Sequence, residues 1–121
     1  MTVKPRRVRV HIQNMPPPER GAEGDVPDRS ADIAFRVTEE RFQAALERHP
    51  DVAAVLDATI SNDLAELPAA AAEAEVVFSK TKVLREQFPV PTAPNLKWVF
   101  VTSAGVETLL PTNWLPPGAV L

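Results

Sequence analysis

The stretch from Asn95 to Leu121, NLKWVFVTSAGVETLLPTNWLPPGAVL, carries the clearest structural signals in this chain of 121 residues. Its Lys97–Val101 run is apolar, β-branched and aromatic, which is typical of a buried strand. The Ser103-Ala104-Gly105-Val106 turn follows at once, and a short helix is predicted from there to Leu110. Glycine at a strand-to-helix turn allows a ligand close to the backbone, and the N–H groups at the start of a helix can bind an anion.

Upstream of this stretch, short strands alternate with short helices. Helices are expected from an N-cap at Thr38 to His49, at Pro68–Ala74 and at Thr81–Phe88. The alternation predicts an α/β fold with an open parallel sheet of about five strands and helices on both faces. Besides Lys97–Val101, the predicted strands are Arg7–Gln13, Val52–Ile60, Val76–Ser79 and the beginning of one at Ala119–Leu121.

The first predicted strand alternates strictly between two kinds of side chain. This alternation predicts a half-buried strand, whose apolar side chains pack in the protein while its polar side chains are expected to face water. Met15–Ser30 follows it, rich in proline, glycine and charge, and is expected to be a mobile loop. The apolar side consists of Val8, Val10 and Ile12, and the polar side of Arg7, Arg9, His11 and Gln13.

Length and composition limit the class of protein. The length fits a single domain spanning residues 1–121, and 45% hydrophobic residues suffice for a core. A net charge of −3 argues against a nucleic-acid binder, and the absence of cysteine excludes thiol chemistry. No apolar run is long enough for a membrane span, no secretory signal is visible, and the two histidines lack metal-ligand spacing. A cytoplasmic protein without a metal is expected.

The segment LKWVFVTSAGVE, followed by LPPGAVL, resembles the substrate domain of the D-isomer-specific 2-hydroxyacid dehydrogenases, and the resemblance extends over roughly residues 31–121. The resemblance implies a flavodoxin-like substrate domain and a separate Rossmann domain that binds NAD or NADP. It implies that this chain is a fragment of such an enzyme, ending near the first crossing between the domains. Its partners would then be a small carboxylate substrate and the missing cofactor domain.

The resemblance also implies a site. Backbone N–H groups of the SAGV loop would hold the substrate carboxylate, a role that falls on Ala104, Gly105 and Val106, with Ser103 beside them. Ser79 and Lys80 leave the third strand at the same edge of the sheet and would line the cleft. The family's general acid/base set lies downstream of this segment, so none of its catalytic residues falls within this chain, and the chain alone is expected to be inactive.

Two functions from different classes remain open. One is this part of an oxidoreductase, in which a hydride would pass between the nicotinamide and C2 of a 2-hydroxy or 2-keto acid. The other is a stand-alone α/β module that binds a small anion or a partner protein and catalyses nothing. Continuation of the reading frame past Leu121 into a G-x-G-x-x-G unit would favour the enzyme. A fragment would also lack part of its cover, so self-association through the vacated surface or the open edge near Ala119–Leu121 is expected.

We predict that this chain binds no dinucleotide. Its glycines are Gly21, Gly24, Gly105 and Gly118, so no G-x-G-x-x-G can exist to hold a pyrophosphate. Titration with NADH, followed by nicotinamide fluorescence, should show no saturation. Saturable binding at micromolar concentration would contradict the prediction.

Overall fold

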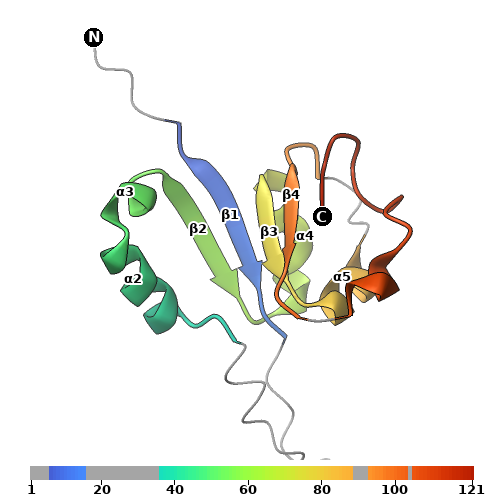
Figure 1. Cartoon of the computed structure of the whole chain (residues 1–121), viewed down its shortest axis with the longest axis horizontal. Helices are drawn as coiled ribbons and strands as arrows, with labels where there is room; N and C mark the ends of the chain where they lie inside the picture. Colours follow the sequence, from blue (N-terminus) through green and yellow to red (C-terminus); the bar gives the residue numbers. More distant parts are fainter. Residues whose placement is uncertain (1–5, 16–35, 89–92, 104) are drawn as a thin grey trace, which may run out of the picture.

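A computed structural model describes residues 6–15, 36–88, 93–103 and 105–121. These residues form an open four-stranded sheet with the order β2-β1-β3-β4, in which every pair of neighbours is parallel (Figure 1). The strands are β1 (Val8–Gln13), β2 (Leu56–Ser61), β3 (Val76–Ser79) and β4 (Trp98–Val101). The predictions of an α/β fold, of β1 inside the sheet and of parallel pairing between β1 and β3 are therefore confirmed.

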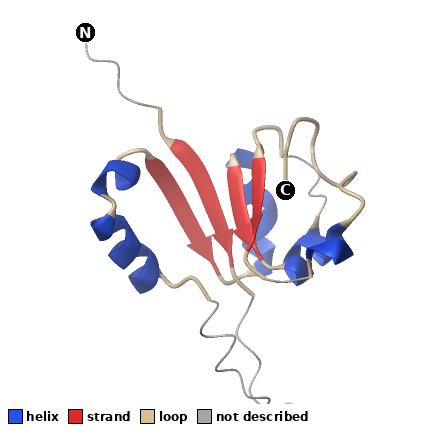
Figure 2. Ribbon diagram, viewed as in Figure 1, coloured by secondary structure: helices blue, strands red, loops and turns tan. Residues whose placement is uncertain are grey.

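The helices are short and follow the strands in alternation (Figure 2). Thr38 caps α2 as predicted, because its hydroxyl accepts a hydrogen bond from the N–H of Arg41 at 3.1 Å. The 3-10 turn η1 leads directly into α4, and a second turn, η2, follows the SAGV loop. The elements are α2 (Glu39–Arg48), α3 (Pro50–Ala53), η1 (Leu64–Glu66), α4 (Leu67–Glu73), α5 (Thr81–Gln87) and η2 (Val106–Leu109).

The predicted second strand was wrong in its first half. Pro50 ends α2 as expected, but it then occupies the first turn of α3, so residues 50–53 are helical and β2 begins only at Leu56. Proline suits the first turn of a helix because its missing N–H would have no partner there. The expected mobile loop lies outside the described residues except for Met15, which packs against the core. Within the described parts of the chain, no helix combines the length and apolarity needed to cross a membrane.

One side of the sheet carries the hydrophobic core. α4 and α5 pack there, and Figure 1 shows α4 behind β3 and β4. Val77 and Val99 from the strands and Leu67 and Leu84 from the helices are all at most 1% exposed. Leu109 and the partly buried Trp114 extend this core towards the C-terminal segment, so the connection after β4 packs on this side as well.

The predicted solvation of the polar side of the first strand is confirmed for Arg7 and Arg9, which are exposed, but it was wrong for His11 and Gln13. His11 and Gln13 are 2% and 1% exposed, and they lie on the same side of the sheet as the core. The parallel register pairs His11 with Thr59 of β2 and Gln13 with Ser61, so the neighbouring strand presents polar groups to them. Because these partners satisfy their hydrogen bonds, the two side chains can be buried at low cost.

The opposite side of the sheet is apolar throughout. The registers place one row across all four strands and on to Val120, which forms a parallel bridge with Trp98. A second row lies one pleat further along. The first row is Ala58, Val10, Val76, Trp98 and Val120, and the second is Ile60, Ile12, Phe78 and Phe100.

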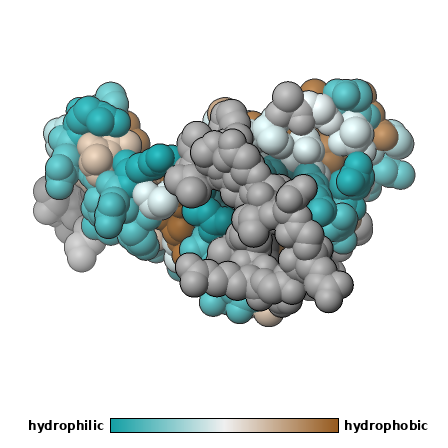
Figure 3. Space-filling view, turned by 90° about the horizontal axis from the view of Figure 1, so that it is seen from below, coloured by the Kyte–Doolittle hydropathy of each residue, from teal (hydrophilic) through white to brown (hydrophobic). Residues whose placement is uncertain are grey.

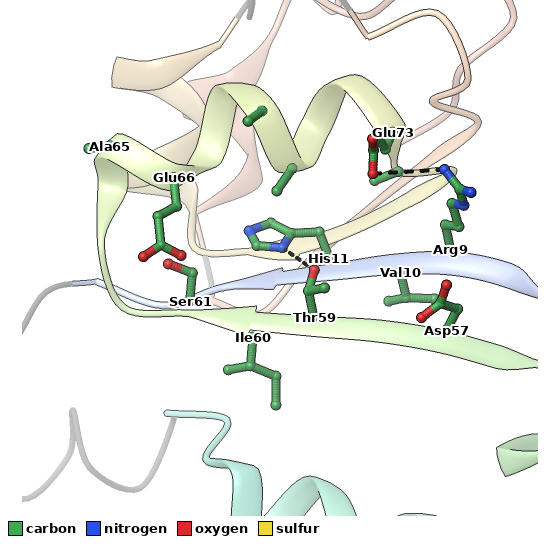
Figure 4. A pocket seen from close by; sticks show the side chains of 13 residues that line it. Arg9, Val10, His11, Asp57, Thr59, Ile60, Ser61, Ala65, Glu66 and Glu73 are labelled. Atoms are coloured by element: carbon green, nitrogen blue, oxygen red, sulfur yellow. Dashed lines mark hydrogen bonds and ion pairs between the residues drawn. The ribbon is translucent and has the colours of Figure 1, made fainter.

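Cover on this apolar side is uneven. α2 lies on this side of the β1–β2 pair, opposite α4, and Ile60 points towards it (Figure 4). Val10 and Ile12 are buried, whereas Trp98 and Phe100 are each 41% exposed and Val120 is 59% exposed. α2 has no buried residue, and the surface of the α2–α3 end is mostly hydrophilic (Figure 3). The exposed aromatic residues therefore gather on the β3–β4 half of the sheet.

Glu75 joins three strands at their amino ends. Its carboxylate forms ion pairs with Arg6 and Lys97 and accepts a hydrogen bond from the backbone N–H of Arg9 at 3.1 Å. Its carbonyl oxygen accepts from the N–H groups of Lys97 and Trp98, at 2.8 and 3.2 Å. The hydrogen bond from Arg9 and the positive charges of Arg6 and Lys97 together lower the pKa of the Glu75 carboxyl, despite its burial.

We predict that Glu75→Gln destabilises the fold by about 1–2 kcal/mol at pH 7, because the charge-assisted hydrogen bond and both ion pairs are lost. A carboxyl with a lowered pKa in the folded state stabilises the protein above its unfolded pKa of 4.5. That contribution disappears as the pH falls through the folded pKa. The difference in urea midpoint between the two proteins should therefore be present at pH 7 and shrink below pH 4.5. Glu86→Gln on the exposed side of α5 is the control, and an equal effect there would contradict the prediction.

Candidate functional site

The carboxyl ends of β3 and β4 bring four of the predicted site residues into one region. The N–H of Thr102 donates to the carbonyl oxygen of Ser79 at 2.9 Å, which continues the β3–β4 pairing beyond the end of β4. Ser79 and Lys80 thus leave β3 beside the start of the SAGV loop. Ser103 and Gly105 follow on that loop, and η2 behind them packs against α5. Ligands of open α/β sheets bind at such an edge.

Ser103 holds the loop to the helix that follows β3. Its hydroxyl accepts a hydrogen bond from the N–H of Thr81 at 2.9 Å and lies 3.2 Å from the Thr81 hydroxyl. Lys80 is the N-cap residue of α5, and it has no side-chain capping bond of its own. Ser103 therefore supplies the cap from the loop after β4, which fixes the loop relative to α5.

Gly105 turns the chain into η2. Its φ of 91° and ψ of 33° lie in the left-handed region, which a residue with a Cβ rarely adopts. Its carbonyl oxygen accepts from the N–H and the hydroxyl of Thr108, at 3.1 and 2.8 Å. Val106 begins η2 and is 47% exposed. The backbone at this point is accessible and locally fixed, while Ala104 lies outside the described residues.

Ser79 has a structural contact that its sequence position did not reveal. Its hydroxyl donates to the carbonyl oxygen of Gln13 at 2.9 Å, and the residue is 1% exposed. This bond ties the end of β3 to the end of β1. The Ser79 side chain is thereby held inside the sheet, and its carbonyl oxygen positions Thr102 of the loop.

Glu107 adds a negative charge close to the same loop. One of its carboxylate oxygens lies 4.0 Å from the position that a Cβ on Gly105 would occupy. A carboxylate at this distance would repel an anion at the Gly105 N–H, and solvent would weaken that repulsion to about 1 kcal/mol or less. Glu107 thus limits the affinity that the loop can have for an anion.

A separate hollow of about 690 Å³ lies between α4 and the β1–β2 pair (Figure 4). The alanines of α4 and of the turn before it form one wall, and their short side chains leave the space open. None of the five described residues of the predicted site lines it. The polar residues around it are Arg9, His11, Asp57, Thr59, Ser61, Glu66 and Glu73.

His11 is the buried titratable group beside this hollow. The side-chain amide of Gln13 donates to the carbonyl oxygens of Asn14 and Asp63 at 3.1 and 3.2 Å, so its oxygen faces His11. The Nε2–H of His11 donates to that oxygen at 2.9 Å, and Nδ1 accepts from the Thr59 hydroxyl at 2.7 Å. Burial lowers the pKa of His11, which the bond to Gln13 and the charge of Glu66 offset only in part. His11 is therefore neutral at pH 7.

The charge of the hollow decides what it cannot bind. Asp57 and Glu73 lie near Arg9 at one end, and Glu66 lies near Ser61 at the other (Figure 4). Three carboxylates against one guanidinium make the hollow unfavourable for an anion. Among the described residues, no group of three His, Asp or Glu side chains is placed to hold a metal ion. The hollow is thus not a candidate for a carboxylate substrate.

The sequence interpretation missed this hollow because it began the second strand too early. With β2 at Leu56–Ser61, Asp57, Thr59 and Ser61 alternate in the same way as Arg9, His11 and Gln13. Two segments of six residues, each with a polar residue at every second position, would have predicted neighbouring strands whose polar side chains lie on the same side of the sheet. That signal was available in the sequence.

Comparison of the chain with protein-family models, with curated proteins and with solved structures finds no match. The resemblance carried by the KWVFV strand and the SAGV loop therefore stays a prediction from the sequence. The function has to be argued from the geometry of the loop and the sheet.

Proposed function

We propose that this chain is part of the substrate domain of an NAD(P)-dependent 2-hydroxyacid dehydrogenase, and that the loop after β4 binds the substrate carboxylate. The observation that carries the proposal is the left-handed Gly105 in an accessible loop at the carboxyl edge of a parallel sheet. The hydrogen bond between Ser103 and Thr81 supports it, because a fixed loop loses little entropy on binding.

The proposed role of this chain is to bind and orient. The N–H groups of Ala104, Gly105 and Val106 would donate to the carboxylate, which leaves C2 of the substrate directed away from the loop. Lys80 at the adjacent strand end would add a favourable charge. The residues present do not fit a dinucleotide, because the glycine pattern for its phosphates is missing. The nicotinamide and the general acid/base group would therefore be supplied by the rest of the proposed enzyme.

We also propose that the sheet has a fifth strand and the flavodoxin-like strand order. Val99 donates to the carbonyl oxygen of Val120, and the N–H of Val120 donates to that of Lys97, each at 2.9 Å. This pairing supports a fifth parallel strand beside β4, which would give the flavodoxin-like order. We also propose a cytoplasmic location, in keeping with a chain that has no cysteine.

One observation favours the rival function, a module that binds a partner protein and has no enzymatic role. Trp98 and Phe100 stand 41% exposed on an apolar sheet face, and exposed patches of this kind mark interaction surfaces. The two proposals make different demands on the loop. The dehydrogenase needs it to recognise a 2-keto or 2-hydroxy acid, whereas a protein-binding module does not.

We predict that pyruvate, used as a simple 2-keto acid, shifts the backbone amide signals of Gly105 and Val106 in a nitrogen-15 NMR titration and saturates at millimolar concentration. Gly105→Ala should weaken this binding at least fivefold. The space for a Cβ is free, but an L-residue at this φ costs about 1–2 kcal/mol and shifts the loop. Glu107→Gln should strengthen binding about two- to fivefold, because it removes a negative charge near the site.

Gly118→Ala is the matched control. Gly118 also has a positive φ, of 83°, and nothing lies within 4 Å of an added Cβ, so the conformational cost is similar but falls outside the loop. Equal loss of pyruvate binding in the two alanine variants would contradict the proposal. Equal binding of pyruvate, acetate and chloride would indicate a general anion site, and would favour a stand-alone module that binds a small anion and catalyses nothing.

A further inference from the structure

The exposed part of the apolar sheet face forms one continuous patch. We define the aromatic patch as Phe78, Trp98, Phe100 and Val120. The strand registers place Phe78 beside Phe100 and Trp98 beside Val120, on the same side of the sheet. The rings of Phe78 and Phe100 stack with their centroids 4.7 Å apart, and Trp98 meets Phe100 edge to face at 5.5 Å.

The rings of the aromatic patch restrain one another through their stacking and edge-to-face contacts. No helix of the described part of the chain lies over them. α4 and α5 pack on the opposite side of the sheet, and α2 lies beyond β2, away from β3 and β4 (Figure 1). The patch therefore presents large, preorganised apolar side chains to solvent, and such side chains dominate the energetics of protein interfaces.

Charge determines which kind of partner fits. The two rows of the apolar face contain no charged side chain, so the patch offers nothing to attract a charged peptide, a nucleic acid or an acidic membrane. It is equally free of like charges that would repel an identical patch. A two-fold axis through it would bring the same apolar residues of two copies together, since a two-fold interface is self-complementary.

The edge of β4 is a weaker candidate for the contact between copies. Its outward backbone groups already pair in part within the chain, because Val99 and Lys97 form hydrogen bonds with Val120. A strand from a second copy would have to displace this pairing, whereas the aromatic patch needs no rearrangement. Of the two surfaces considered from the sequence, the structure favours the sheet face.

We propose that the aromatic patch is a contact surface between two copies of this chain, which pack their sheets face to face about a two-fold axis. Facing sheets approach to about 10 Å and keep their strands within about 30° of each other. Three neighbouring extended segments span only about 15 Å, so the interface is smaller than the roughly 800 Å² per partner of a standard stable complex. The dimer is therefore weak, with a dissociation constant between about 10 μM and 1 mM. This inference does not depend on the dehydrogenase proposal.

Sedimentation velocity of the whole chain between about 10 μM and 1 mM tests the inference. The weight-average mass should rise from 13.2 kDa towards twice that value as the concentration increases. Phe100→Asp and Val120→Asp should each keep the mass at that of the monomer across the range. Val120 stacks on no ring, so its variant tests the patch even if Phe100→Asp lowers stability.

Val52→Asp is the matched control, because Val52 lies on α3 and is 42% exposed, like Phe100. It should leave the association unchanged. A wild-type chain that stays monomeric to about 1 mM would overturn the inference, and would point to a segment of a longer chain or another protein as the cover. An equal effect of Val52→Asp and Val120→Asp would overturn it too. Neither result would bear on pyruvate binding at the SAGV loop.

Discussion

The burial of polar side chains beneath α4 is the constraint on which the rest of this structure depends. β1 has a parallel strand on each side, so its N–H and carbonyl groups are used in the sheet and its side chains must be accommodated above and below. His11 and Gln13 can be buried beneath α4 because Thr59 and the carbonyl oxygens at the strand ends form hydrogen bonds with their side chains. The two side chains also form a hydrogen bond with each other. An unpaired polar group there would cost about 1–3 kcal/mol.

This arrangement assigns opposite characters to the two faces of the sheet. With the polar side of β1 turned towards α4, the apolar side is turned towards α2 and the solvent beyond it. Burial of apolar surface contributes about 25 cal/mol of free energy for each Å² removed from water. A partner that covers the aromatic residues on β3 and β4 would therefore gain binding free energy from them. The loop at the carboxyl edge is independent of this face, since Ser103 and Gly105 are fixed by contacts to α5 and η2.

Local signals predicted much of the fold. Val76–Ser79 was located correctly because a short β-branched run lies between an alanine-rich helix and a capping position. The cap at Thr38 followed from the same local chemistry. Local signals could not predict where α3 ends and β2 begins, because the segment VAAVLDATI suits a helix as well as a strand. Pairing with β1 determines which of its residues form the strand. The burial of His11 was missed because its partner Thr59 is 48 residues away and becomes a neighbour only through the sheet register. The sequence located the loop after β4 correctly. It could not predict that the Ser79 hydroxyl points into the sheet, because that hydroxyl bonds to the carbonyl oxygen of Gln13 on β1.

The orientation of the sheet faces can be measured directly by adding a soluble paramagnetic agent to a dilute NMR sample, in which the chain is monomeric. The agent broadens the signals of side chains that it can approach. The account predicts strong broadening of the Trp98 and Phe100 rings, and little for the His11 ring and the Gln13 side-chain amide. Broadening of His11 and Gln13 equal to that of Trp98 would mean that the polar side of β1 faces solvent, and would contradict the account.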